Sequence, residues 1–264
     1  MKKIIFAFFA FLFIALTLTA CINFNDEQAT LDKIKQRDKL IVGVKTDSKP
    51  FGYKNEKGEI VGYDVDLAKK IAENILGDPN KIELVEVTSA NRIMKLTSGE
   101  VDILISSFTI NPQRKKAVDF SVPYFATGQA LMVKKGSKIK TFADLENKSI
   151  GVVIGTTAEQ NIKEFAPRAV IKSVKTYQEL YDLLKEGKVD VITSDAAILR
   201  GFEIDDSEVV LLSGRYTKEY YGIAFRKDEE SESLQDTVDS ILNKLNTTNF
   251  LVQLGKTWIS DERW

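Results

Sequence analysis

Residues 101–114 join a run of strand-forming residues to polar groups that could bind a ligand. The apolar run is followed directly by Ser106 and Ser107, then by Thr109 and, after a turn, by Arg114. Hydroxyls and a guanidinium are hydrogen-bonding groups that a buried strand does not need in order to fold. Their position indicates a binding function, although Ser and Thr after a strand also serve as plain turn residues.

A second polar strand end occurs in an internal repeat. Residues 96–104 (LTSGEVDIL) are matched by residues 184–192 (LKEGKVDVI). Each copy combines a helix end, a Gly suited to a left-handed C-cap and a strand that begins Val-Asp. The second copy leads to Ser194 and Asp195, and the repeat aligns Asp195 with Ser107.

The elements around both copies follow the same order, strand–helix–strand–helix–strand. In the first unit we expect strands at 40–45, 82–87 and 101–105 and a helix over 91–97. A further helix is expected between the first two strands, with one apolar face formed by Val65, Ala68, Ile71, Ala72 and Ile75. In the second unit we expect strands at 150–154, 170–174 and 189–192, with helices over 158–165 and 177–185. This alternation predicts an α/β fold with two parallel sheets, each covered by helices, and ligands bind outside the carboxyl ends of such strands.

The organisation into lobes follows from the repeat and from the chain after it. Two extended segments, Gln129–Val133 and Tyr220–Phe225, are predicted to cross between the lobes as a hinge. A helical region from Ser233 to Leu245 and an apolar tail ending at Trp258 and Trp264 are expected to pack on the first lobe. We therefore assign 38–127 with 221–264 to lobe 1 and 128–220 to lobe 2.

The N-terminus has the features of an export signal. Lys2 and Lys3 precede a long apolar run that ends in Leu-Thr-Ala before Cys21. This pattern predicts a signal peptide over 1–20 with a lipobox, lipidation of Cys21, and a tether with a lead-in helix over 21–37. The alternative is an uncleaved membrane helix, because the uncharged stretch is long enough to span a bilayer. Either way we expect an exported chain held at the outer face of the membrane, or a periplasmic one.

Composition excludes several classes of site. The chain has 264 residues, one Cys and no His, with a formal net charge of −1. A single Cys gives no internal disulfide, and the absence of His removes Ser-His and Cys-His nucleophiles and His-containing metal sites. No basic stripe indicates nucleic acid. We expect no cofactor and no metal.

With these motifs in place, the chain resembles the extracellular solute-binding proteins for polar amino acids, the receptors of ABC importers. The resemblance covers about Asp38 to Trp258 and is closest to the glutamate- and aspartate-binding members. It rests on the segments 62–68 (GYDVDLA), 105–110 with Arg114, 119–124 (DFSVPY), 151–157 and 189–195. It implies a two-lobed periplasmic-binding-protein fold of type II, with two hinge crossings.

The resemblance also implies roles for single residues. Arg114 would bind the ligand carboxylate in a bidentate manner, with Thr109 and backbone donors near Ser107 completing that site. Thr157 would add a donor from the second lobe at a helix N-terminus, and Asp195 would pair with the ligand ammonium. Ser106 and Thr156 complete the predicted set.

Each of these roles has a structural alternative. Ser106 could be a turn residue, and Arg114 lies in an Arg-Lys-Lys run that is typical of a solvated face. Asp195 could be the N-cap of the following helix. Asp64 and Asp66 are expected to support their own helix rather than to contact ligand.

Two further cations bear on the ligand side chain. Lys45 ends the first strand, and Arg92 opens a helix in a segment similar to that of glutamate- and aspartate-binding relatives. A ligand carboxylate buried in a cleft needs such partners, so we predict L-glutamate or L-aspartate, with glutamine, asparagine or cysteine as alternatives. Ser89 is small where many relatives place an aromatic residue. The structural alternatives are a solvent-facing Lys45 and a surface ion pair of Arg92 with Glu86.

Other functional classes find less support. Some exported dehydratases resemble this fold, and Glu159 is the nearest candidate for a catalytic carboxylate, but no second catalytic group accompanies it. A sensor would need a membrane helix and a signalling module. We therefore expect a non-enzymatic, monomeric receptor whose partners are a free L-amino acid, the membrane through lipid on Cys21, and a membrane permease backed by an ATPase.

Overall fold

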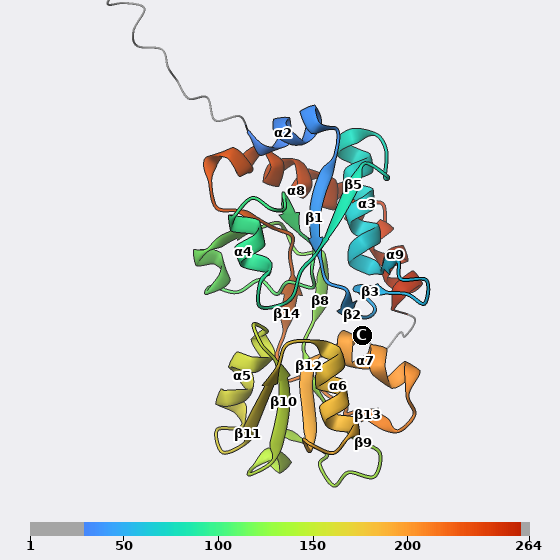
Figure 1. The fold of residues 1–264 in the computed structure, drawn as a ribbon, viewed down its shortest axis with the longest axis vertical. Helices are drawn as coiled ribbons and strands as arrows, with labels where there is room; N and C mark the ends of the chain where they lie inside the picture. The colour runs from blue at the N-terminus through green and yellow to red at the C-terminus, as the bar shows by residue number, and fades with distance from the viewer. Residues whose placement is uncertain (1–28, 260–264) are drawn as a thin grey trace, which may run out of the picture.

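The computed structural model describes residues 29–259, which form two lobes joined by a narrow waist (Figure 1). The predicted signal peptide over 1–20, the tether up to residue 28, Cys21 and Trp264 lie outside the described residues. Within 29–259 no helix is both long and apolar enough to cross a membrane.

Lobe 1 is built on a five-stranded sheet in the order β5-β1-β6-β15-β7. Its strands are β1 (Leu40–Val44), β5 (Ile82–Glu86), β6 (Ile103–Leu104), β7 (Val118–Phe120) and β15 (Ala224–Arg226). A small antiparallel sheet, β2 (Asp47–Ser48), β3 (Gly52–Lys54) and β4 (Ile60–Val61), lies between β1 and the first long helix. The helices are α2 (Thr30–Arg37), α3 (Tyr63–Leu76), α4 (Arg92–Thr97), α8 (Glu232–Thr247) and α9 (Phe250–Trp258).

Lobe 2 is built on a second five-stranded sheet in the order β11-β10-β12-β9-β13. Its strands are β9 (Gln129–Lys134), β10 (Ser149–Val153), β11 (Val170–Val174), β12 (Val191–Asp195) and β13 (Val209–Leu211). Its helices are α5 (Thr157–Phe165), α6 (Tyr177–Lys185) and α7 (Ala196–Asp205). Short 3-10 turns occur at Arg114–Lys116, Phe142–Leu145 and Glu229–Ser231.

The internal repeat is confirmed in three dimensions. The units β1-α3-β5-α4-β6 and β10-α5-β11-α6-β12 have the same element order, and their strands have the same neighbours, β5-β1-β6 and β11-β10-β12. Both trios are parallel. The carboxyl ends of the two parallel trios therefore carry the equivalent polar segments predicted from sequence.

The sheets are mixed rather than wholly parallel. The antiparallel strand β9 lies between β12 and β13, and the antiparallel strand β15 lies between β6 and β7. Both strands lie outside the repeated units: β9 precedes the second unit in the chain, and β15 follows that unit and returns to the first sheet.

The hinge differs from the expectation in one of its two segments. The crossing strands are β8 (Phe125–Thr127) and β14 (Glu219–Tyr221), which pair antiparallel with each other. The segment predicted at Gln129–Val133 was wrong as a crossing, because it forms the interior strand β9 of the second sheet. All five of those residues are buried, which suits an interior strand.

The C-terminal helices pack on lobe 1 as predicted. The buried face of α8, with Leu234, Val238 and Leu242, faces α2 and α3, where the 3.6-residue period places these residues in one row. Helix α9 lies against α3, and the indole of Trp258 donates to Asp66 at 2.8 Å. Asp66 thus has a structural role, but it joins α3 to α9 rather than supporting only its own helix.

Candidate functional site

All nine predicted binding residues are buried where the two lobes meet. They are Lys45, Arg92, Ser106, Ser107, Thr109, Arg114, Thr156, Thr157 and Asp195. Topology explains the convergence, because these residues lie at or after the carboxyl ends of the parallel strands β1, β5 and β6 in lobe 1 and β10 and β12 in lobe 2.

Two arginines form the centre of the lobe 1 side. The guanidinium carbons of Arg92 and Arg114 lie 3.9 and 4.5 Å from the ring centroid of Phe108. Arg92 Nη1 donates to the Ser106 carbonyl at 2.9 Å, and Arg114 Nη1 donates to the Thr109 carbonyl at 2.7 Å. The strand end thus orients both guanidinium groups through backbone oxygens.

The burial of the two arginines contradicts the structural alternatives, a solvated face for Arg114 and a surface ion pair with Glu86 for Arg92. Arg114 is 8% exposed and Arg92 is 2% exposed, so neither lies on a solvated face. Glu86 instead accepts from Thr46 and Lys54. Burial lowers the pKa of both arginines, with the charge of Arg114 adding to the effect on Arg92. Both remain cations at neutral pH.

Gly155 of lobe 2 contacts both arginines of lobe 1. Its carbonyl accepts from Arg114 Nη2 at 3.1 Å and from Arg92 Nη2 at 3.5 Å. Its φ is 80°, and a Cβ there would meet the carbonyl oxygen of Ser89 at 2.6 Å. Only glycine permits this turn and this contact together.

One carboxylate oxygen of Asp195 faces no donor from the described residues. Its Oδ2 accepts from the Tyr221 hydroxyl at 2.7 Å, whereas its buried Oδ1 has no hydrogen-bond partner among residues 29–259. Asp195 stands at the N-cap position of α7, but its side chain makes no capping bond. Burial and the charge of Glu219 raise its pKa to about 6. The arrangement favours pairing with a ligand cation over a capping role.

Lys45 is buried against an aromatic ring. Its ammonium lies 4.8 Å from the ring centroid of Tyr177 and makes no hydrogen bond or ion pair with another described residue. With 2% exposure it is not a solvent-facing residue. Burial, followed by the charge of Arg92, lowers its pKa to about 7. Lys45 therefore has donors available for a ligand.

Glu219 was not among the residues predicted from the sequence, yet it connects the predicted residues Thr109 and Thr157. Thr109 Oγ1 donates to its Oε2 at 2.8 Å, and Thr157 Oγ1 donates to the same oxygen at 2.9 Å. Gln129 Nε2 donates to Oε1 at 2.6 Å. Residues 215–221 (RYTKEYY) offered no spacing or motif that would single out this carboxylate.

Thr156 has a structural use within lobe 2. Its hydroxyl accepts from the Glu159 backbone N–H at 3.3 Å and donates to the Val153 carbonyl at 2.7 Å, which caps α5. Glu159, the candidate catalytic carboxylate, accepts from the Gly155 N–H at 3.0 Å and from Ser173 Oγ at 3.1 Å. Both side chains thus hold the turn that carries Gly155.

Several polar atoms between the lobes are buried without a partner in the described part of the chain. They are Ser89 Oγ, Arg92 Nε, Ser106 Oγ, Ser107 Oγ, Thr127 Oγ1 and Asp195 Oδ1. Native proteins seldom leave buried polar atoms unpaired, so such a set indicates a ligand that supplies the missing bonds. The set includes a cationic donor and an anionic acceptor, which suits a ligand with charges of both signs. No group of three or more His, Cys, Asp or Glu that could hold a metal ion occurs within 29–259.

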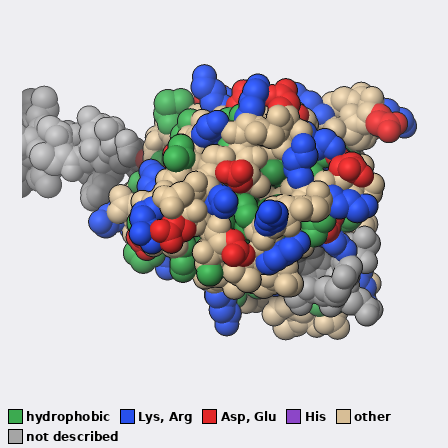
Figure 2. Space-filling model, turned by 90° about the horizontal axis from the view of Figure 1, so that it is seen from below, with side chains coloured by type: hydrophobic (Ala, Val, Ile, Leu, Met, Phe, Trp, Pro, Cys, Tyr) green, Lys and Arg blue, Asp and Glu red, His purple; other side chains and the backbone are tan. Residues whose placement is uncertain are grey.

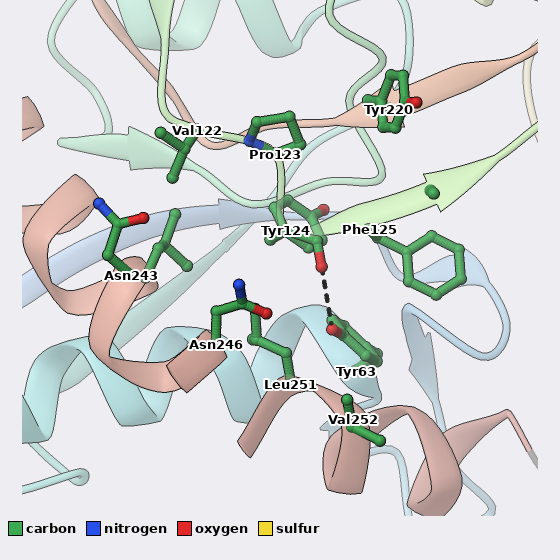
Figure 3. Close-up of a pocket in the computed structure, with 12 residues that line it drawn as sticks. Tyr63, Val122, Pro123, Tyr124, Phe125, Tyr220, Asn243, Asn246, Leu251 and Val252 are labelled. Carbon is green, nitrogen blue, oxygen red and sulfur yellow. Dashed lines mark hydrogen bonds between the residues drawn. The ribbon is translucent and has the colours of Figure 1, made fainter. Parts of the chain in front are cut away.

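Other surfaces of the molecule do not share these features. A groove of about 490 Å³ lies beside the hinge between β8 and the helices α8 and α9, lined by Tyr124, Asn246 and Leu251 among others (Figure 3). No predicted binding residue lines it. On the lobe 2 end of the molecule, positive and negative side chains are interspersed (Figure 2).

Comparison with known proteins identifies relatives along nearly the whole chain. A family model described as bacterial extracellular solute-binding proteins, family 3, matches residues 40–261. The ABC transporter glutamine-binding protein GlnH of Bacillus subtilis is 39% identical, covering 99% of each chain. A glutamine-binding protein of Geobacillus stearothermophilus is 46% identical over 79% of this chain and 81% of its own. The glutamate-binding protein GluB of Corynebacterium glutamicum is 33% identical over 87% and 81%.

Solved structures agree on the two-lobed fold. A cysteine-binding protein from Campylobacter jejuni superposes with a TM-score of 0.83 at 32% identity, covering 87% of this chain and 92% of its own. An ancestral amino-acid-binding protein, described as a precursor of cyclohexadienyl dehydratase, gives a TM-score of 0.81 at 35% identity, with 87% and 99% covered.

Proposed function

The chain belongs to the bacterial extracellular solute-binding proteins of family 3, and from this membership we propose that it captures a free polar amino acid for an ABC importer. The observation that carries the proposal is the pairing of opposite charges across the lobes. Arg114 in lobe 1 and Asp195 in lobe 2 are both buried and interact electrostatically, and Oδ1 of Asp195 is unpaired, as an α-carboxylate and an α-ammonium require.

The α-carboxylate is assigned to Arg114. A guanidinium has more N–H donors than the two that Arg114 uses on the carbonyls of Thr109 and Gly155. The unpaired hydroxyls of Ser106 and Ser107 stand at the same strand end and can donate to ligand oxygens. Binding would replace their missing hydrogen bonds and keep the lobes together.

The α-ammonium is assigned to Asp195 and to Thr109. The proton of the Thr109 hydroxyl is given to Glu219, so this hydroxyl presents only lone pairs elsewhere. An ammonium can donate to those lone pairs, whereas a carboxylate cannot. We therefore assign the Thr109 side chain to the ammonium, although the family resemblance implied a role at the carboxylate.

For the ligand side chain we propose L-glutamine, with L-glutamate as the second candidate. Lys45 and Arg92 Nε are donors without partners, so the side chain should end in an acceptor oxygen. The buried charges of the region already balance. The positive charges are those of Lys45, Arg92 and Arg114, and the negative charges are those of Asp64, Asp195 and Glu219.

This balance favours a neutral side chain, because a further buried carboxylate would leave one negative charge uncompensated. The two glutamine-binding relatives support the same choice. The cations that led to the dicarboxylic expectation still favour L-glutamate as the second candidate, which the glutamate-binding relative supports.

The remaining proposals follow from family membership. We propose export with Cys21 lipidated, a monomeric receptor, and delivery of the amino acid to a membrane permease. A role in transport rather than catalysis fits Glu159, whose carboxylate is engaged by Gly155 and Ser173.

Titration calorimetry on the refolded mature chain tests the function. The panel is L-glutamine, L-glutamate, L-aspartate, L-asparagine, L-cysteine and L-arginine, with the deaminated analogue of glutamine as a control. We expect the tightest binding for L-glutamine and none for the analogue. Absence of binding to every amino acid of the panel would refute the proposal.

A further inference from the structure

Glu219 occupies an unusual place for a carboxylate. It begins the hinge strand β14, opposite Thr127 of β8, and is buried. Both of its oxygens accept hydrogen bonds from side chains: Oε2 from Thr109 and Thr157, and Oε1 from Gln129 at 2.6 Å, Thr217 at 3.2 Å and Asn161 at 3.5 Å. These donors satisfy the buried charge, as a buried carboxylate requires.

The direction of the hydrogen bonds sets the polarity of the binding space. A hydroxyl has one proton, and an ionised carboxylate only accepts. Thr109 and Thr157 therefore both point their protons at Glu219. The oxygen of Thr157 accepts from Gln129 Nε2 at 3.0 Å, while Thr109 makes no other side-chain hydrogen bond among the described residues. The Thr109 hydroxyl can therefore only accept, and not donate, a further hydrogen bond.

The same carboxylate joins the two lobes. Thr109 follows the end of the first sheet, whereas Thr157 is the first residue of α5 in lobe 2. Both bonds to Oε2 exist only while α5 lies against the polar strand end of lobe 1. Opening of the lobes would break at least one of them.

We propose that Glu219 is a positioning residue for amino-acid capture. It acts on the ligand through Thr109, by holding that hydroxyl as an acceptor for the ligand ammonium, and it favours the closed arrangement through Thr157. This inference rests on the proposed function, because it assumes a ligand with an ammonium group.

Glu219→Gln tests the inference with little change in shape. If the amide nitrogen faces the threonines, it donates to them, and their protons turn toward the ligand. If the amide oxygen faces them, the nitrogen meets the donors of Gln129, Thr217 and Asn161. We expect the affinity for L-glutamine to fall about 10- to 100-fold in calorimetry, the range for lost hydrogen bonds to a charged group. Tyr220→Phe, on the exposed side of the same strand, is the matched control and should bind as wild type.

A double-mutant cycle with Thr109→Val separates positioning from general support. If Glu219 acts through Thr109, the double variant should bind about as well as the weaker single variant. The inference would be overturned if the fold-losses in affinity of the two single variants multiplied in the double variant. It would also be overturned if Glu219→Gln bound L-glutamine like wild type. Failure of wild type to bind any amino acid would instead refute the proposed function.

The proposed effect of Glu219 on closure of the lobes is measured without ligand. Fluorescent labels on Met94→Cys and Val170→Cys, two exposed positions on different lobes, report the interlobe distance in a chain that carries Cys21→Ser. We expect Glu219→Gln to shift the ligand-free population toward a longer distance. An unchanged distance distribution would contradict the role of Glu219 in closure, whether or not the chain binds amino acids.

Discussion

The backbone N–H of Ser107 donates to the carboxylate of Asp64 with an N···Oδ2 distance of 2.7 Å. Ser107 has a φ of 44°, in the left-handed region that side-chain-bearing residues seldom adopt. The other carboxylate oxygen, Oδ1, accepts from the Tyr124 hydroxyl at 2.9 Å. Asp64 therefore holds Ser107, which has this strained conformation, through a hydrogen bond to its backbone, and both carboxylate oxygens of Asp64 are engaged by protein donors.

Asp64→Asn should weaken both the fold and the site. The amide can accept only one of the two hydrogen bonds, so a buried donor loses its partner, at a cost of about 1–3 kcal/mol in the free energy of unfolding. The affinity for amino acid should fall as well, because Ser107 relaxes from its left-handed conformation. Chemical denaturation and calorimetry at pH 7.5 measure both effects, with Asp66→Asn as a control in the same helical turn. Ligand affinity equal to wild type in Asp64→Asn would show that Asp64 supports the fold only.

Arg114→Ala should nearly abolish binding. Removing one partner of a buried charge pair costs about 3–5 kcal/mol, which corresponds to two to three orders of magnitude in affinity or more. Arg114→Lys should recover little, because an ammonium cannot reproduce the planar pair of N–H donors. Calorimetry with Lys115→Ala, the exposed neighbour, provides the control. Wild-type affinity in Arg114→Ala would place the carboxylate elsewhere.

Binding should weaken below pH 6. Burial and the charge of Glu219 raise the pKa of Asp195 to about 6, and the ligand ammonium pairs with its ionised form. Above that pH the Asp195 carboxylate is already ionised, so the affinity for L-glutamine should be flat. Below it the ligand must displace a proton, so affinity falls by up to about tenfold per pH unit.

Asp64 also titrates near pH 6, because burial raises its pKa to about 6. Calorimetry between pH 4.5 and 8 on Asp64→Asn distinguishes the two carboxyl groups. The pH dependence should persist in that variant if Asp195 causes it, and should vanish if Asp64 does.

The titration of Lys45 should give L-glutamate and L-glutamine different pH dependences of affinity. Burial and the charge of Arg92 lower its pKa to about 7, so its charged fraction declines as the pH rises through 7. L-glutamate needs the charged form, and its affinity should fall between pH 7 and 9 by up to about tenfold per unit. L-glutamine, which has no side-chain charge, should change little.

Lys45→Met removes the charge while keeping the length of the side chain. The affinity for L-glutamate should fall at least about tenfold at pH 6.5, where Lys45 of the wild type is mostly protonated. The affinity for L-glutamine should fall less. Equal losses for both ligands would mean that Lys45 supports the structure through its contact with Tyr177 rather than selecting the ligand.

The sequence by itself determined the order of the elements and the location of the candidate site. Short apolar strands alternating with amphipathic helices, and a Gly-strand repeat, depend on local patterns, so β1-α3-β5-α4-β6 and its copy in lobe 2 were predictable. The rule that ligands lie at the carboxyl ends of parallel strands then brought Lys45, Ser107 and Asp195 together, and the family resemblance added Arg114.

Only the tertiary structure decided which partners these groups have. Glu219 meets Thr109 from 110 positions away and Thr157 from 62, and Asp64 meets Ser107 from 43. Contacts at such separation depend on how the lobes and the hinge come together, and no local period or motif encodes them. The hinge strand was misplaced for the same reason: Phe125–Thr127 and Gln129–Lys134 are both extended, and only strand pairing distinguishes a crossing from an interior strand.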